Sequence, residues 1–349
     1  MATIKELKEL ALHAARGTAP AEYTASNVDE ALRGELAQMC SSINNFMRNR
    51  YDIYDIIIET ADEIVPTKVI DVMGTFAEIK SVPQGQKAIF KRGLIGRNRA
   101  KKFLTQVGLS GVYETFRLDN ETFELGGHAI GGAAAIDFER FLDGAENMAD
   151  LMDIITEGLS DAVFGEVQRL LIEAAGKMID GSNKVSSASF EADKMVKLIN
   201  TVKAYGGSAV IFAAPEFIGA MGADAIVPVI AGAAQGVYHP DDIDAIHKTG
   251  KIKIFRGTPV VEIPQSFVDE TNKETVINPQ YAYVLPSGKE KVVKVVFEGN
   301  TQVRDLTNAD GSMEIHTYKK MGAAILTYHN WGIYQNTGIT DTSEFPYGV

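Results

Sequence analysis

LMDIITEGLSDAVFGEVQRLLIEAAGKM, residues 151–178, is the most regular stretch of the chain. Its apolar residues recur every three or four positions without interruption, which is the spacing of one face of an α-helix. Asp143 and Glu146 lie just before it, at the three-residue spacing of a helix start. The pattern predicts one continuous helix over 144–178, about 50 Å long at ~1.5 Å per residue. Because the mean helix is about a third of that length, this helix needs an unusual architecture around it.

The outer face of this helix is mostly acidic, and opposite charges do not alternate along its flanks. A coiled coil would show such alternation. The sequence therefore favours a lone helix packed on a sheet over a supercoiled pair.

The first 66 residues carry helical periodicity that is weaker. Apolar residues follow helical spacing over 3–15 and again over 28–49. We expect the second helical stretch to continue over 51–64 and to end before Pro66, because a proline disfavours helix in the residue that precedes it. The apolar strip of the first segment is narrow, so these residues are predicted to form an arm rather than a core.

Strand-forming residues dominate from 69 to about 130, which predicts an extended hairpin-like excursion. VYETFRLDNETFEL, residues 112–125, reads as a hairpin turned at Asp119 and Asn120. The middle of the excursion is basic, with six cations in twelve positions: Lys91, Arg92, Arg97, Arg99, Lys101 and Lys102. Such a run is either a solvated loop or a contact surface, and the sequence leaves both open.

A glycine-rich stretch, GGHAIGGAAAIDF (126–138), joins this excursion to the long helix. Gly126 and Gly131 have the separation of a phosphate-binding loop, but Gly132 and Ala133 stand where that loop needs lysine and a hydroxyl residue. We therefore predict that the glycines serve a bend with positive φ rather than a phosphate.

The second half alternates helix and strand before it becomes rich in strands. A helix is predicted over 191–205, a buried strand over 208–214, a helix opening at Pro215, and a short helix over 239–250. Strands are predicted from 251 onward.

Composition excludes several classes of protein. The 349-residue chain has a formal charge of −12, which argues against a general nucleic-acid binder. Its one cysteine, Cys40, excludes an internal disulfide. No apolar run reaches the ~20 residues of a membrane span, and the N-terminus does not resemble a signal peptide. We predict no membrane partner, no cofactor and no metal.

Catalytic motifs are also missing from the sequence, since neither H-E-x-x-H nor G-x-S-x-G occurs. One function that the sequence still allows is that of a small-molecule enzyme or binding protein, with His239, Asp241 and Asp242 as its site. A solvated helix start explains these acids without any ligand.

The order of elements resembles the major capsid proteins of tailed bacteriophages, which have the Hong Kong 97-type fold. The residues that carry the resemblance are the long helix, MVKLINTVKAYGGSAVIFAAPEF (195–217) and IFRGTPVVEIP (254–264). The resemblance implies an α+β fold in four parts. These are an N-terminal helical arm (1–66), an E-loop (67–130), a peripheral domain (131–190 and about 300–349, with the spine helix at 144–178) and an axial domain (191–299).

The resemblance also implies a function without catalysis. Copies of the chain would form the pentamers and hexamers of an icosahedral shell around double-stranded DNA, with scaffolding and portal proteins as partners and only non-specific contact with the DNA. The location would be the virion, after assembly in the host cytoplasm. An encapsulin-type nanocompartment shell is the related alternative.

In that family the E-loop reaches over the peripheral domain of an adjacent subunit. The basic run would then contact four acids on a neighbour's spine helix: Asp150, Asp153, Glu157 and Asp161.

Overall fold

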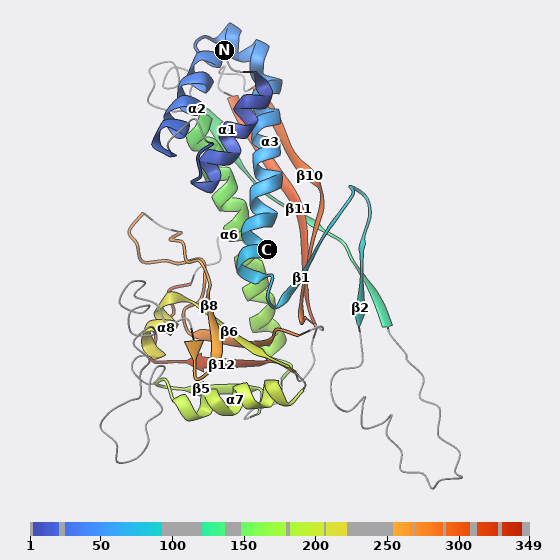
Figure 1. The fold of residues 1–349 in the computed structure, drawn as a ribbon, viewed down its shortest axis with the longest axis vertical. Coiled ribbons are helices and arrows are strands. Elements are labelled where there is room, and N and C mark those ends of the chain that lie inside the picture. Colours follow the sequence, from blue (N-terminus) through green and yellow to red (C-terminus); the bar gives the residue numbers. More distant parts are fainter. Residues whose placement is uncertain are drawn as a thin grey trace, which may run out of the picture.

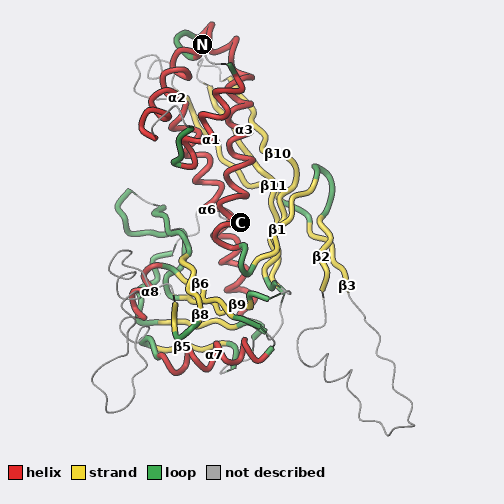
Figure 2. The backbone as a smooth tube through the Cα atoms, viewed as in Figure 1, coloured by secondary structure: helices red, strands yellow, loops and turns green. Residues whose placement is uncertain are grey.

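The computed structural model describes residues 3–20, 25–92, 121–136, 148–178, 182–205, 207–221, 254–268, 270–288, 291–307, 313–326 and 330–343. Over these residues the chain is α+β. Two long helices run side by side, a four-stranded sheet lies along them, and a six-stranded sheet with its own helices occupies the other end of the molecule (Figure 1, Figure 2).

The predicted long helix is confirmed as α6, Met148–Ala175, although it ends before the expected end at 178. Residues 144–147, including the expected start after Asp143, lie outside the described residues. Leu159, Val163 and Val167 are buried on the inner side of α6, as the periodicity predicts. The helix is not alone, however, because it packs against α3 as well as against the four-stranded sheet.

Three helices form the N-terminal region: α1 (Ile4–Arg16), α2 (Ala25–Met39) and α3 (Ile43–Met73). The prediction that the helix ends before Pro66 was wrong, since α3 runs through this proline. A proline inside a helix costs about 3 kcal/mol. Burial of Val65, Val69 and Met73 against α6 and the sheets offsets this cost, because each such side chain contributes roughly 1.5–3 kcal/mol.

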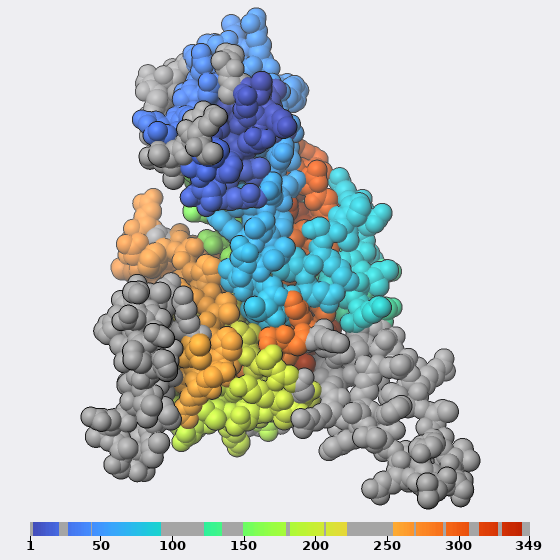
Figure 3. All heavy atoms as spheres, in the orientation of Figure 1, coloured from blue at the N-terminus to red at the C-terminus, as the bar shows by residue number. Residues whose placement is uncertain are grey.

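The N-terminal helices also have a core of their own, contrary to the prediction of an arm without one. The side chains that fill it come from all three helices and from the start of α6: Leu7, Leu10, Ala11, Val28, Leu32, Leu36, Phe46, Ile53, Ile57 and Met152. Lys8 adds an ion pair to Asp55 at 2.6 Å, which joins α1 to α3. In the space-filling view these helices form one continuous end of the molecule (Figure 3).

The four-stranded sheet has the order β1-β10-β11-β4. Its strands are β1 (Ala77–Val82), β10 (Val293–Thr307), β11 (Met313–Ile325) and β4 (His128–Ile136). The first pair is parallel and the other two are antiparallel. The sheet thus joins residues from both ends of the chain on one side of the two long helices.

The glycine-rich stretch lies largely within β4, so the predicted bend is wrong. Gly131 pairs with Tyr318 and Gly132 with Thr317 of β11, and neither glycine has a positive φ. A Cβ at Gly131 would lie 2.6 Å from the Tyr318 Cα atom, and closer still to the carbonyl oxygen of Thr317. Close approach of two strands requires this glycine.

The six-stranded sheet has the order β5-β12-β9-β6-β8-β7. Its strands are β5 (Lys184–Ser187), β12 (Gly332–Asn336), β9 (Tyr281–Pro286), β6 (Ala209–Ala213), β8 (Thr258–Glu262) and β7 (Ile254–Phe255). The helices α7 (Ala192–Ala204) and α8 (Pro215–Met221) confirm the predictions for that region. The helix expected over 239–250 lies outside the described residues.

Each of the two larger sheets contains strands from more than one of the domains predicted from the sequence. β5 and β12 fall in ranges expected for the peripheral domain, yet they join the sheet that holds the axial elements. β10 begins within the axial range and belongs to the other sheet. Sheet membership therefore follows pairing between distant strands, not contiguous blocks of sequence.

The predicted start of the excursion was wrong, because residues 69–73 belong to α3 and 77–82 form β1 of the four-stranded sheet. The hairpin that follows is described only at its root. β2 (Ala88–Arg92) pairs antiparallel with β3 (Glu121–Leu125), and this two-stranded ladder stands beside the four-stranded sheet (Figure 1). The turn expected at Asp119 and Asn120 lies outside the described residues.

Candidate assembly surfaces

Aromatic packing fixes the root of the hairpin to the body of the subunit. Phe90 of β2 is fully buried against Val296 of β10, and its ring stacks on that of Phe123 with 5.8 Å between the centroids. Lys80 of β1 donates a hydrogen bond to the carbonyl of Ile89 at 2.7 Å. The ladder therefore leaves the sheet from a defined position.

The carboxylate of Glu298 contacts both the segment that leads into the hairpin and the segment that leads out of it. Its Oε1 accepts hydrogen bonds from the backbone N–H of Gly85, at 2.9 Å, and from the ammonium of Lys320, at 3.3 Å. Gly85 precedes β2, and the backbone of Gly127, which follows β3, also bonds to Glu298. The Gly85 N–H first, and then Lys320, lower the pKa of Glu298. The arrangement restrains the direction in which the hairpin leaves the sheet.

The basic run reaches the described residues only at its start. Lys91 is exposed on β2, and Arg92 ends that strand. Four of the cations lie outside the described residues: Arg97, Arg99, Lys101 and Lys102.

The four acids of the expected contact are not equivalent. Asp150 pairs within its own chain with Arg33, at 2.7 Å, and Arg33 also binds Asp29, at 2.9 Å. The side chain of Asp153 is exposed, but local desolvation first, and then the charge of Asp29, raise its pKa, and Arg33 opposes this shift. Asp150 is thus already neutralised by α2, whereas Asp153 lies among like charges.

Glu157 and Asp161 line a groove of about 380 Å³ between α3 and α6. The other polar residues of its lining are Lys68 and Asp71 of α3, Ser160 of α6 and Ser266. Burial is the main reason that the pKa of Asp161 is raised, and a hydrogen bond with Ser266 opposes that shift. The groove carries three carboxylates against one ammonium, so it favours a cationic occupant.

An apolar patch at the far end of α3 escaped the sequence analysis. Met47 and Tyr51 are 43% and 67% exposed. Arg50 is held over this patch by Asp305, at 3.0 Å, and by the Tyr51 hydroxyl, at 2.8 Å. The helical spacing over 28–49 includes Met47 among its apolar positions, but this side chain lies on the exposed side of α3. Exposed Tyr, Met and Arg side chains are typical of protein interfaces.

A second apolar surface is a groove of about 190 Å³ between β4 and α6. The small residues of β4 form one wall, and Ile154 of α6, which is 67% exposed, forms part of the other. The small residues of β4 and the exposed Ile154 side chain together give this groove an apolar surface.

Comparison with known families identifies the class of protein to which these surfaces belong. A family model described as "SPbeta prophage-derived putative capsid protein YonB" matches residues 7–335. The chain belongs to this capsid protein family. The match covers the helical N-terminal region, the hairpin root, α6 and both sheets, so the expectation of a phage capsid protein is confirmed. A search of curated protein sequences finds no match.

Solved structures similar to this capsid family member include a virus-like particle, a phage capsid and an encapsulin. A virus-like particle from Pyrococcus furiosus is 12% identical, with 80% of this chain and 99% of that chain covered and a TM-score of 0.45. The capsid of cyanophage P-SCSP1u is 10% identical, with 74% and 86% covered and a TM-score of 0.48. The SrpI encapsulin from Synechococcus elongatus PCC 7942 is 13% identical, with 82% and 92% covered and a TM-score of 0.43.

The residues of the alternative enzyme site, His239, Asp241 and Asp242, lie outside the described residues. Within the described ranges, no three His, Cys, Asp or Glu side chains group as metal ligands would. No helix in that part of the capsid subunit is long and apolar enough to cross a membrane. Cys40 is buried, and burial raises its pKa to about 12, which keeps the thiol protonated and unreactive.

Proposed function

We propose that this protein is the major capsid protein of a tailed bacteriophage. Identical copies would assemble into an icosahedral shell that encloses double-stranded DNA, and the subunit would perform no chemistry. The family match over residues 7–335 carries this proposal. The exposed apolar side chains of Tyr51 and Ile154 support it, because contacts with other copies would bury them.

We further propose that the basic run acts between subunits. In this arrangement the cations from Lys91 to Lys102 contact the acids of a neighbour's α6. Asp150 already pairs with Arg33 of its own chain and would contribute less to this contact. Asp153, Glu157 and Asp161 would then be the main partners of the cations. Exposed ion pairs contribute only about 0–1 kcal/mol each, and their effect in a shell comes from repetition in every subunit.

Charge reversal with rescue tests this contact. Arg97→Glu with Arg99→Glu should leave the melting temperature of the subunit nearly unchanged and reduce the particle fraction in sedimentation velocity. The loss should be larger at low salt, where like charges are least screened. Adding Asp153→Lys with Glu157→Lys in the same chain should restore particles. Normal assembly of the first double variant at low ionic strength would show that the run is a solvated loop.

The remaining partners follow from this function. Scaffolding and portal proteins would join during assembly in the host cytoplasm, and the mature location would be the virion. The same shell architecture in an encapsulin would enclose an enzyme, so the contents of purified particles separate the two alternatives. DNA supports the viral coat, and a protein cargo supports the nanocompartment.

A further inference from the structure

A groove lined by lysines lies at the end of the molecule opposite to the N-terminal helices. It occupies about 420 Å³ between the edge strand β5 and helix α7. Lys184 comes from β5, and Lys194 and Lys197 come from one face of α7. The rest of the lining is Ser182, Val185, Ser186 and Leu198, with no carboxylate among them.

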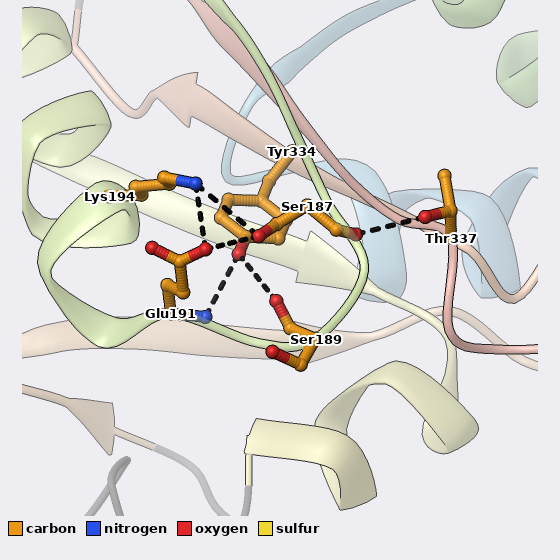
Figure 4. Close-up of polar contacts among 6 residues, drawn as sticks. All are labelled: Ser187, Ser189, Glu191, Lys194, Tyr334 and Thr337. Atoms are coloured by element: carbon orange, nitrogen blue, oxygen red, sulfur yellow. Dashed lines mark hydrogen bonds and ion pairs between the residues drawn. The ribbon is translucent and has the colours of Figure 1, made fainter.

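Hydrogen bonds hold the wall of this groove in place. Glu191 pairs with Lys194 at 2.7 Å and also bonds to Ser187 of β5, which lies 3.4 Å from the same ammonium (Figure 4). The buried Tyr334 accepts a hydrogen bond from the Glu191 backbone N–H at 2.9 Å and donates one to the Ser189 carbonyl at 3.2 Å. The start of α7 is thereby tied to β12, so the position of Lys194 is defined before any ligand arrives.

The cluster in Figure 4 is not arranged for nucleophilic catalysis. A Ser–Lys pair acts through a neutral amine that removes the serine proton. Here Glu191 keeps Lys194 in an ion pair, and that lysine in turn lowers the pKa of Glu191. The arrangement therefore holds Lys194 in an ion pair and does not offer its amine as a base.

The charge balance around the groove favours an anion. Three ammonium groups line it without a carboxylate, and Glu191, outside the lining, pairs with the ammonium of Lys194. Asp193 of α7 lies near Arg256, at 3.7 Å, and is absent from the groove lining. This is a local excess of positive charge on a chain whose formal charge is −12. Such a surface attracts a polyanion in spite of the overall sign.

The chemistry of the lining identifies the kind of anion. Lysines act as point charges on phosphate oxygens, whereas recognition of a planar carboxylate favours the guanidinium fork of arginine. Serine hydroxyls also donate to phosphates. The groove lining holds no aromatic side chain on which a base could stack, as single-strand binding requires.

We propose that this groove contacts the phosphate backbone of double-stranded DNA through Lys184, Lys194 and Lys197. The proposal rests on the proposed function, because a shell filled with DNA brings duplex phosphates to its inner wall. It assigns to one surface of the subunit a contact that is independent of base sequence, and it places α7 and β5 on the inside of the shell.

The test measures binding of full-length, unassembled subunits to a fluorescent 30-base-pair duplex over a range of salt concentrations. One variant carries Lys184→Gln, Lys194→Gln and Lys197→Gln. The matched control removes three exposed cations elsewhere, through Lys5→Gln, Arg48→Gln and Lys87→Gln. Each phosphate contact contributes about 0.9 to the slope of log K against log salt. We expect the groove variant to reduce this slope by about 2–3, and the control by less than about 1.

A further variant guards against loss of folding. Lysine-to-arginine changes at the same three positions keep the charge and should keep the DNA affinity within about threefold, while circular dichroism checks the fold of every variant. Equal slopes for the glutamine groove variant and its control would overturn the proposal. So would an unchanged slope together with loss of particles, because the groove would then contact an acidic surface of a second copy.

Particle formation by the wild-type chain is scored separately, by sedimentation. Failure of the wild-type chain to assemble counts against the proposed function. Failure of the DNA titration alone counts against the groove.

Discussion

Adjacent glycines in β4 offer a matched pair of substitutions whose effects should differ in sign. At Gly131 a new Cβ would lie 2.6 Å from the Tyr318 Cα atom, against an ordinary contact of at least 3.4 Å, and the blocking atoms belong to the backbone of β11. At Gly132 a Cβ would meet nothing within 4 Å. Gly131→Ala must therefore move one strand away from the other, and Gly132→Ala need not.

Overpacking of this kind costs about 1–3 kcal/mol, and disturbed ladder hydrogen bonds add roughly 1 kcal/mol each. The loss of chain entropy in the unfolded state returns about 0.4–1 kcal/mol for either substitution. We expect Gly131→Ala to lower the free energy of unfolding by about 1–3 kcal/mol and Gly132→Ala to raise it by up to about 1 kcal/mol. Urea unfolding of unassembled subunits, followed by circular dichroism, measures both. Equal stabilities of the two variants would refute the assignment of Gly131 to close strand approach.

Three further perturbations test the core and the hairpin root. Val167→Asp places a charge at a fully buried position of α6 and should abolish soluble folded protein, whereas Ile154→Asp on the exposed side of the same helix should leave the yield of folded subunits unchanged. Asp62→Asn removes the negative charge that pairs with the buried ammonium of Lys319 and should lower the free energy of unfolding in urea by about 3 kcal/mol. A smaller loss with Lys319→Met added would identify the uncompensated charge as the cause. The pKa of Glu298 is lower in the folded state than the ordinary glutamate pKa of 4.5, so ionised Glu298 stabilises the fold at pH values above 4.5. The free energy of unfolding should therefore fall as the pH drops through the folded-state pKa. Glu298→Gln should flatten this dependence in urea midpoints measured between about pH 5 and 3, and an unchanged pH profile would exclude the carboxylate as its source.

Elements with strong local signals were predictable from the sequence. The apolar stripe of α6, the fully apolar β6 and the proline that opens α8 each depend on residues within one element. Pro66 misled the prediction, because the tertiary packing of α3 outweighs a local preference. Gly131 misled the prediction for a similar reason, because the backbone of β11, far away in the sequence, lies too close to this glycine for a Cβ atom.

Contacts between distant residues account for what the sequence could not provide. β1 pairs with β10, and the Gly85–Glu298 hydrogen bond spans 213 positions, so neither the sheet order nor the restraint on the hairpin follows from periodicity. Charge patterns did single out Asp150, but its partner Arg33 lies on another helix and was not foreseen. The lysine groove combines β5 with α7, whose lysines are unremarkable in each segment taken alone.

Electron microscopy of the purified full-length protein tests the proposed assembly most directly. Many identical copies of a major capsid protein should associate, so the images should show closed shells of uniform size, or rings of five and six subunits, at high protein concentration. A strictly monomeric protein at that concentration, without rings or shells, would contradict the assignment of this chain as a shell-forming subunit.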